Sequence, residues 1–208
     1  AAMEIELKLA LNPPDALNTL LNALPQPTAV LRQTNHYFTD PAGRLANDRI
    51  MVRVRENEHE GEPSRSTVIL TIKCRASVEG GVFTAREDEV SLVADDWFAV
   101  RDAGRPLLDI GGARLRAVCA QRAITDLVEV GLFHNTRHCI PFHGFNLEVD
   151  RTLFPNGRVD AEIEVETEAH DRARELLQAF AARYGFDLTP QTLGKYSRFL
   201  SIIQSSPR

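Results

Sequence analysis

Charged and apolar residues alternate along several stretches of this chain, beginning with EIELKL at positions 4–9. Because neighbouring residues of a β-strand point to opposite faces, this alternation predicts strands with one charged face and one apolar face. The charged positions that share a face in the later stretches are Arg53 and Arg55, Lys73 and Arg75, Glu87 and Glu89, Glu148 and Asp150, and Glu162, Glu164 and Glu166.

For a single strand, such a pattern is typical of an antiparallel sheet with one face in water. Here, however, strand after strand repeats charges of one sign, and like charges on adjacent positions of a face repel unless an opposite charge lies between them. Acidic rows therefore indicate a metal ion, and basic rows indicate a polyanion. If the sheet closes with these faces inward, the barrel has a charged interior and helices cover its apolar outside, the reverse of the usual small barrel.

The same patterns predict where the elements lie. The expected strands are 4–11, 32–38, 50–56, 66–76, 84–92, 127–133, 137–141, 145–153 and 158–167, and the polar segment 57–65 is expected to be a mobile loop. The expected helices are 15–24, 95–100, 113–121, 170–184 and 189–204. The last of these begins at Thr189-Pro190, a favourable N-cap and first-turn pair.

Length and composition limit the protein class. A chain of 208 residues favours one domain, which we expect to span 3–204, with Ala1 and Ala2 added in front of a natural start at Met3. The net charge of −5 argues against nucleic acid as the main partner. No apolar run is long enough for a membrane span and no secretory signal is visible. The three cysteines lack metal-site spacing, which favours a reducing, cytoplasmic location.

A series of motifs resembles the CYTH superfamily, the triphosphate tunnel metalloenzymes. EIELK at 4–8 resembles its ExExK signature, VRVR at 52–55 its arginine strand, LTIK at 70–73 its lysine strand, and EVE at 164–166 its late ExE strand. Glu87 and Glu89 resemble its middle acidic pair, Arg137 its phosphate-binding arginine, and Lys195 the lysine of its last helix. The resemblance covers nearly the whole chain and is greatest to the short plant-type tripolyphosphatases.

The resemblance implies a mainly β, α+β fold: a closed eight-stranded antiparallel barrel that forms a tunnel, with helices outside. Members of the superfamily bind a linear triphosphate with Mg²⁺ or Mn²⁺. They hydrolyse inorganic tripolyphosphate, nucleoside triphosphates or thiamine triphosphate, and some cyclise ATP.

The resemblance also implies roles for individual residues. It implies that the metal is held by Glu4, Glu6, Glu164 and Glu166, with Glu162 in place of Glu166 if the register differs by two. It implies that phosphate is bound by Lys8, Arg53, Arg55, Lys73, Arg137 and Lys195, with Arg75 and Arg198 as weaker candidates. The expected candidates for positioning the attacking water are Glu6, Glu87 and Asp150.

A few positions depart from the family pattern or carry no expected role. Ala85 stands where an arginine usually precedes the middle acidic pair, so Arg86 replaces it only if a bulge turns Arg86 inward. Asn135 stands where a lysine is common. We expect Arg122 on a helix surface and Trp97 in packing. The histidines, of which His134, His138 and His143 are expected near a turn, show no metal-site spacing.

The sequence therefore predicts metal-dependent hydrolysis of inorganic tripolyphosphate to diphosphate and phosphate. Thiamine triphosphatase or adenylate cyclase activity on the same fold is an alternative, and so is a non-catalytic polyphosphate-binding module. The expected partner is a small triphosphate; no protein partner is indicated.

Overall fold

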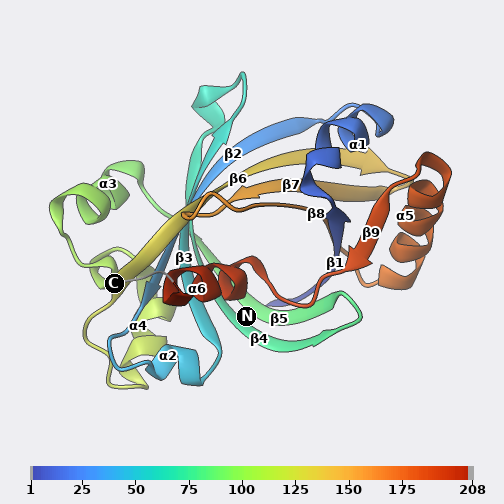
Figure 1. Ribbon diagram of the computed structural model, residues 1–208. Helices are drawn as coiled ribbons and strands as arrows, with labels where there is room; N and C mark the ends of the chain where they lie inside the picture. The colour runs from blue at the N-terminus through green and yellow to red at the C-terminus, as the bar shows by residue number, and fades with distance from the viewer. Residues whose placement is uncertain (1, 206–208) are drawn as a thin grey trace.

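The structure, a computed structural model, describes residues 2–205. Eight antiparallel strands close a barrel in the order β5–β4–β3–β2–β6–β7–β8–β1, with β1 pairing back onto β5, and β9 extends one edge of β1 (Figure 1). The strands are β1 (Ala2–Asn12), β2 (Ala29–Thr39), β3 (Ile50–His59), β4 (Thr67–Glu79), β5 (Val82–Ser91), β6 (Val128–Phe142), β7 (Phe145–Leu153), β8 (Val159–Glu166) and β9 (Asp187–Pro190). The predicted closed barrel is confirmed.

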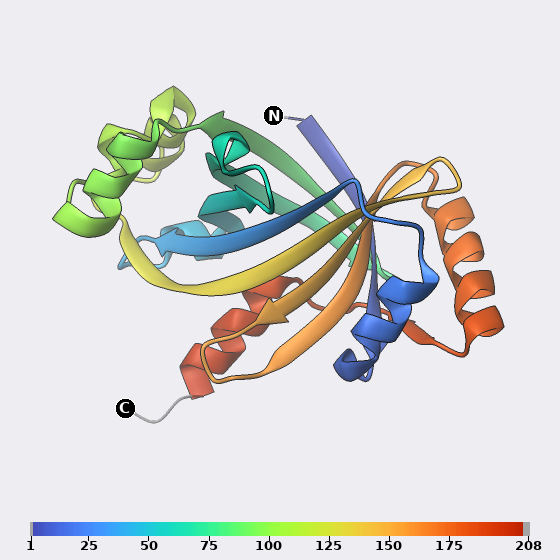
Figure 2. The ribbon, with the colours of Figure 1, turned by 90° about the horizontal axis from the view of Figure 1, so that it is seen from above.

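Helices lie outside the barrel in two groups (Figure 2). One group is α1 (Leu17–Ala23) with α5 (His170–Tyr184); the other is α2 (Arg44–Asn47), α3 (Ala94–Ala103) and α4 (Gly112–Ala120). The last helix, α6 (Lys195–Ser205), crosses in front of the barrel interior between the β6–β8 side and the β4–β5 side (Figure 1). None of the described helices has the length and apolar character needed to cross a membrane.

The apolar faces of the strands point outward and pack under these helices. Leu7, Ile163 and Val165 are buried against Leu20 of α1 and Leu177 of α5. A second core forms on the opposite side of the barrel, where β3 and β4 pack under α2, α3 and α4. Since each fully buried side chain of this kind contributes about 1.5–3 kcal/mol, the outer layers stabilise the barrel and leave its interior to polar side chains.

Trp97 of α3 is fully buried in the second core and donates a hydrogen bond from Nε1 to Glu56 Oε1 at 2.6 Å. Glu56 also contacts His36, whose Nδ1 lies 2.8 Å from Glu129 Oε1. Burial lowers the pKa of His36, but the hydrogen bonds with Glu56 and Glu129 outweigh it and raise the pKa overall. Trp97 is therefore a packing residue, as expected, and also ties α3 to the barrel.

Strand β6 corrects one expectation. We expected two strands at 127–133 and 137–141 with a turn between them, but β6 is continuous from Val128 to Phe142 and contains His134 and His138. Its middle is polar because Asn135 faces the barrel interior, where Nδ2 donates to Gln33 Oε1 and Oδ1 accepts from Thr152 Oγ1. The polar residues of this stretch pair inside the barrel, so the strand continues where a turn is expected.

The expected helix 189–204 is also wrong at its start. Residues Asp187–Pro190 form β9, which pairs with β1 from Leu9 to Asn12, and the helix begins only at Lys195. Strand β9 takes the part of the β1 edge that β5 leaves free, and the pairing buries Leu188. Tertiary pairing therefore overrides the local capping signal of Thr189-Pro190.

Two smaller expectations also change. The expected loop 57–65 starts inside β3, because Asn57 is buried and accepts a hydrogen bond from Gln33 Nε2 at 3.0 Å. Arg122 follows the end of α4 rather than lying on its surface. Its guanidinium donates to the carbonyl of Val118 at 2.9 Å and to Asp48 Oδ2 at 2.6 Å, so it caps the helix.

Candidate active site

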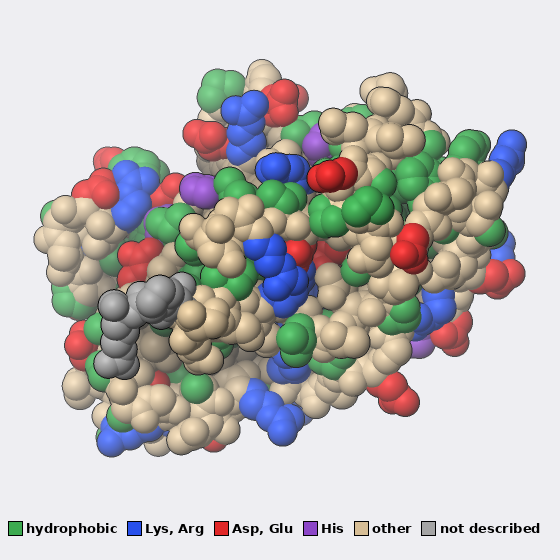
Figure 3. Space-filling view, viewed as in Figure 1, with side chains coloured by type: hydrophobic (Ala, Val, Ile, Leu, Met, Phe, Trp, Pro, Cys, Tyr) green, Lys and Arg blue, Asp and Glu red, His purple; other side chains and the backbone are tan. Residues whose placement is uncertain are grey.

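One cavity of about 240 Å³ occupies the barrel interior beside α6. Side chains from β1 to β8 and from α6 contribute to its wall, and most of them are charged. On the face shown in Figure 3, basic side chains gather near the middle, with acidic side chains recessed beside them. The charged strand faces found in the sequence therefore converge on one cavity.

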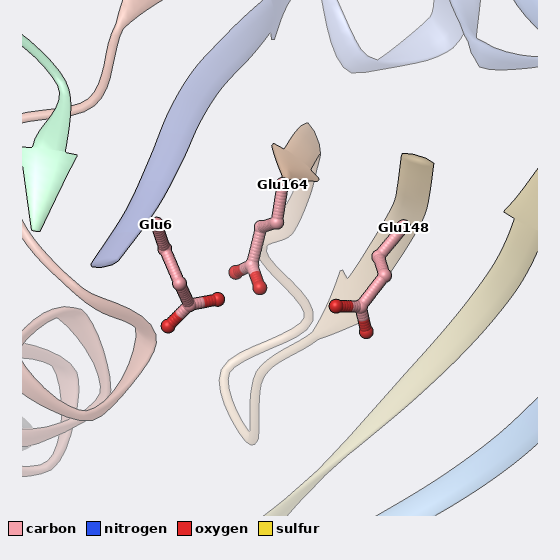
Figure 4. A group of neighbouring side chains, drawn as sticks. All are labelled: Glu6, Glu148 and Glu164. Carbon is pink, nitrogen blue, oxygen red and sulfur yellow. The ribbon is translucent and has the colours of Figure 1, made fainter. Parts of the chain in front are cut away.

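Three carboxylates from adjacent strands meet on one side of the cavity. Glu6 of β1, Glu148 of β7 and Glu164 of β8 point toward one another, and each places an oxygen within 4.8 Å of the other two (Figure 4). The strand register brings them together, because Glu164 pairs with Lys8 on one side and with Glu148 on the other. Three hard oxygen donors at this spacing can hold Mg²⁺ or Mn²⁺, which water and phosphate oxygens would complete.

The electrostatics of the three carboxylates support a cation at this position. Burial raises the pKa of Glu6, and the neighbouring Glu164 raises it further. Burial likewise raises the pKa of Glu148, with smaller contributions from Glu164 and Asp150. For Glu164, burial is outweighed by Lys195, Lys8 and Arg137, which hold its pKa well below the usual range. A divalent cation would relieve the repulsion that Glu6 and Glu148 experience when ionised.

The other expected metal ligands lie near this group. Glu4 Oε1 is 2.5 Å from Lys73 Nζ, and Glu166 lines the cavity at the exposed end of β8. Glu162 is buried and contacts Lys195 and Arg198. Sequence reasoning gave Glu148 no role, although it had placed this residue on the charged face of its strand.

Three arginines line the cavity without a carboxylate partner among residues 2–205. Arg53 donates from Nη2 to Thr71 Oγ1 at 3.1 Å and Arg55 from Nε to Asn35 Oδ1 at 2.7 Å. Arg75 lies 3.4 Å from Ser197 Oγ and over the ring of Phe83. The positive charges of these three side chains are thus available to an anion.

The pKa of Arg55 reflects the electrostatic cost of placing these arginines close together. Burial, followed by the like charges of Arg53 and Arg137, lowers its pKa to about 9. Burial also lowers the pKa of Arg75. Gly194 makes room for Arg75, since a Cβ there would come within 2.5 Å of its Nη2. A bound polyanion would remove the cost of holding these cations together.

Three further expected cations already contact carboxylates. Lys8 Nζ lies 3.6 Å from Glu164 Oε1, and Lys73 Nζ lies 3.1 Å from Glu6 Oε1. Arg137 donates to both oxygens of Asp150, at 2.9 and 2.8 Å, and forms an ion pair with Glu148. All three cations line the cavity, so they can contact a ligand while fixing the acidic side chains.

The α6 cations turn toward acidic residues of β7 and β8. Lys195 lies at the cavity wall, with Nζ among Asp150, Glu162 and Glu164. Arg198 pairs with Asp160 at 2.6 Å and with Glu162 at 2.8 Å. Asp150 is fully buried beneath Arg137 and Lys195.

The remaining expected positions lie in the middle of β5. Glu87 has a pKa raised first by burial, and its Oε2 lies 3.9 Å from Lys73 Nζ. Ala85 lines the cavity, whereas Arg86 is exposed. The register shift between β4 and β5 lies in β4, between Arg75 and Ser77, and does not turn Arg86 inward.

Tyr37 and Tyr196, which sequence reasoning did not select, also line the cavity, and their rings stack with centroids 4.5 Å apart.

Comparisons with known proteins agree with this architecture. The model of the CYTH domain matches residues 2–187. A structure of HpAC1 from Hippeastrum, named for adenylyl cyclase and described as having a dominant triphosphatase activity, is 28% identical, with a TM-score of 0.82 and 95% of each chain covered.

Two bacterial structures share the fold at lower identity. One from Bacillus halodurans is 20% identical, with a TM-score of 0.65, and covers 96% of this chain and 99% of its own. One from Vibrio parahaemolyticus is 15% identical, with a TM-score of 0.56, and covers 97% and 99%. No curated protein matches the chain. The match of the family model over most of the chain shows that it belongs to the CYTH domain family.

Proposed function

We propose that the protein hydrolyses a linear triphosphate in a metal-dependent reaction, with inorganic tripolyphosphate as the main substrate and diphosphate and phosphate as products. One observation carries the proposal: Arg53, Arg55 and Arg75 have no acidic partner in the described part of the chain and face the same cavity as the Glu6–Glu148–Glu164 group. The dominant triphosphatase activity of the Hippeastrum relative supports it.

The charges suit a metal-bound polyphosphate better than a single phosphate. A divalent cation at the acidic group cancels only part of the charge of tripolyphosphate, and the unpaired arginines supply the rest. Arginine offers a planar fork that matches phosphate oxygens, and lysine a point charge. We propose that Arg53, Arg55 and Arg75 bind phosphate directly, together with Lys8, Lys73 and Arg137 from the acidic side.

We propose Mg²⁺ or Mn²⁺ as the metal, held by Glu6, Glu148 and Glu164 and flanked by Glu4 and Glu166. When bound, such an ion neutralises charge on the phosphoryl group and orients the triphosphate. The residues that hold it use only carboxylate oxygens, which are the ligands these hard cations prefer.

In this mechanism, water attacks the terminal phosphoryl group in line with the leaving oxygen, and the protein supplies positioning and charge. Glu6 and Glu87 both lie beside Lys73, at 3.1 and 3.9 Å, so either can orient a water next to that amine. Asp150 is fully enclosed and holds both oxygens against Arg137. We propose that Asp150 positions Arg137 and that Glu6 or Glu87 positions the water.

A second candidate substrate class is an organic triphosphate such as thiamine triphosphate or ATP. It is favoured by a mainly apolar groove of about 500 Å³, lined in part by Ile50, Ala76 and Leu200, which adjoins the cavity. Met51, Lys73, Arg75 and Tyr196 belong to both spaces. An organic group could lie in the groove while its phosphates enter the barrel.

Phosphate release from tripolyphosphate, ATP and thiamine triphosphate, with Mg²⁺, Mn²⁺ or a chelator, tests the proposal. We expect the highest kcat/KM with tripolyphosphate and no release with the chelator. A higher kcat/KM for an organic triphosphate would select the second candidate, and cyclic AMP from ATP would indicate a cyclase. Tight binding of tripolyphosphate without turnover under any metal condition would contradict hydrolysis and favour a binding module.

A further inference from the structure

A second group of three carboxylates lies next to the first and deeper in the barrel. Asp150, Glu162 and Glu164 are all buried and place oxygens within 4.8 Å of one another. The ammonium of Lys195 sits among them. Its Nζ lies 2.8 Å from Asp150 Oδ2, donates a hydrogen bond to Glu164 Oε1 and forms an ion pair with Glu162 Oε1.

The ammonium of Lys195 matches the charge of the three carboxylates, but its N–H bonds do not point at all three oxygens. An ammonium donates along three fixed N–H bonds, and the Glu164 oxygen accepts one of them. Glu162 Oε1 is buried and has no hydrogen-bond partner of good geometry, although it contacts the amine. The three oxygens lie close enough together to hold one cation, and the amine at their centre leaves the Glu162 oxygen without a hydrogen bond, so they form a cation cage that a side chain fills imperfectly.

Lys195 is also the first residue of α6, and Arg198, one turn later, pairs with Asp160 and Glu162. Both cations are buried, and both reach acidic residues of β8. The start of α6 is thus held against the barrel by charge as well as by the packing of Phe199 and Ile202.

We propose that Lys195 is a built-in counter-ion: its ammonium occupies the position that a second divalent cation would take among Asp150, Glu162 and Glu164, and thereby pins α6 over the barrel interior. Lys195 is then a positioning residue, and the free protein holds its exchangeable cation at Glu6, Glu148 and Glu164. The inference concerns cation binding without substrate, so it stands or falls separately from the proposed triphosphatase activity.

The test is the number of Mn²⁺ ions bound by the substrate-free protein, measured by the electron paramagnetic resonance signal of free Mn²⁺. We expect Lys195→Met to bind about one Mn²⁺ ion more per chain than the wild type, because three buried carboxylates lose their cation. Arg198→Met is the matched control: it removes a buried cation from the same helix but leaves the amine in the cage, so its stoichiometry should equal that of the wild type.

The double variant Lys195→Met/Glu162→Gln should lose the extra ion, since one cage ligand is gone. Equal stoichiometry in Lys195→Met and the wild type would overturn the proposal, and so would a gain in Arg198→Met. If Lys195→Met unfolds too readily for titration, its Tm decides. The proposal requires Mn²⁺ to raise the Tm of Lys195→Met more than it raises the Tm of the wild type. It also requires that, without metal, the double variant Lys195→Met/Glu162→Gln has a higher Tm than Lys195→Met. Failure of either requirement overturns the proposal.

Discussion

Replacing Glu148 with glutamine is expected to reduce metal-dependent phosphate release by at least about 10²-fold, since even residues that only orient metal ligands typically matter 10- to 100-fold. The same change should leave Tm unchanged or raised when no metal is present. Burial raises the pKa of Glu148, so its ionised form is less favourable in the folded protein than in the unfolded chain. Steady-state kinetics over a range of Mg²⁺ concentrations and thermal unfolding with a chelator measure both effects.

Glu164→Gln is the informative comparison. It also removes one carboxylate of the acidic group, but it should lower the stability of the protein, whereas Glu148→Gln should not. Lys195, Lys8 and Arg137 hold the pKa of Glu164 below its unfolded value. The ionised carboxylate therefore stabilises the fold above the unfolded pKa, and that stability is lost as pH falls through the folded pKa. Glu164→Gln should cost up to about 3–5 kcal/mol. Full activity of Glu148→Gln at an unchanged Mg²⁺ optimum would contradict the assignment of the acidic group.

Arg55→Met is expected to lower kcat/KM for tripolyphosphate by about 10²-fold, because each lost charge-assisted contact is worth about 1.5–3 kcal/mol. Its Tm without substrate should hold or rise. Burial and the charges of Arg53 and Arg137 lower the pKa of Arg55 to about 9, so its charge destabilises the free protein below that pH. For the same reason, the wild-type KM should increase above about pH 9, and the KM of Arg55→Met should not.

Arg122→Met is the control for this prediction. Arg122 lies outside the cavity, caps α4 and pairs with Asp48, so the variant should lose stability but keep its kcat/KM. An Arg55→Met enzyme with wild-type kinetics, or an Arg122→Met enzyme as impaired as Arg55→Met is expected to be, would show that the cavity arginines do not bind the substrate.

The strands and their charged faces could be predicted because their determinants are local, whereas closure into an eight-stranded barrel was expected from the resemblance to the CYTH superfamily. Alternation at a period of two places Glu4, Glu6 and Lys8 on one face and Leu7 and Leu9 on the other, whatever the strand pairs with. Charges of one sign repeated on that face in strand after strand favour a charged interior over a face in water, because like charges repel unless an opposite charge lies between them. Most strands therefore lie within a few residues of their expected positions.

The acidic group could be predicted only in part, because alternation gives the face of a side chain but not its row across the sheet. Glu148 meets Glu164 through the register of β7 with β8, which depends on how distant strands align. Glu166, on the same face of β8, lies one step further along, at the exposed strand end. Register is set by tertiary packing, so the sequence could not decide which carboxylates converge.

The paired and unpaired cations were beyond sequence reasoning for a related reason. Arg53 and Arg137 both come from strands with charged faces, yet only Arg137 meets an acidic residue directly across the sheet, Asp150. The cross-strand neighbour of Arg53 on β4 is Thr71. These cross-strand neighbours determine whether an arginine pairs with a carboxylate of the site or keeps its charge available to an anion.

The most direct test of the account is a crystal structure with Mn²⁺ and a non-hydrolysable tripolyphosphate analogue, with Mn²⁺ located by its anomalous scattering. The account predicts an Mn²⁺ peak bound by Glu6, Glu148 and Glu164, and phosphate oxygens in contact with Arg53 and Arg55. An Mn²⁺ peak away from these carboxylates, or an analogue bound outside the barrel cavity, would contradict it.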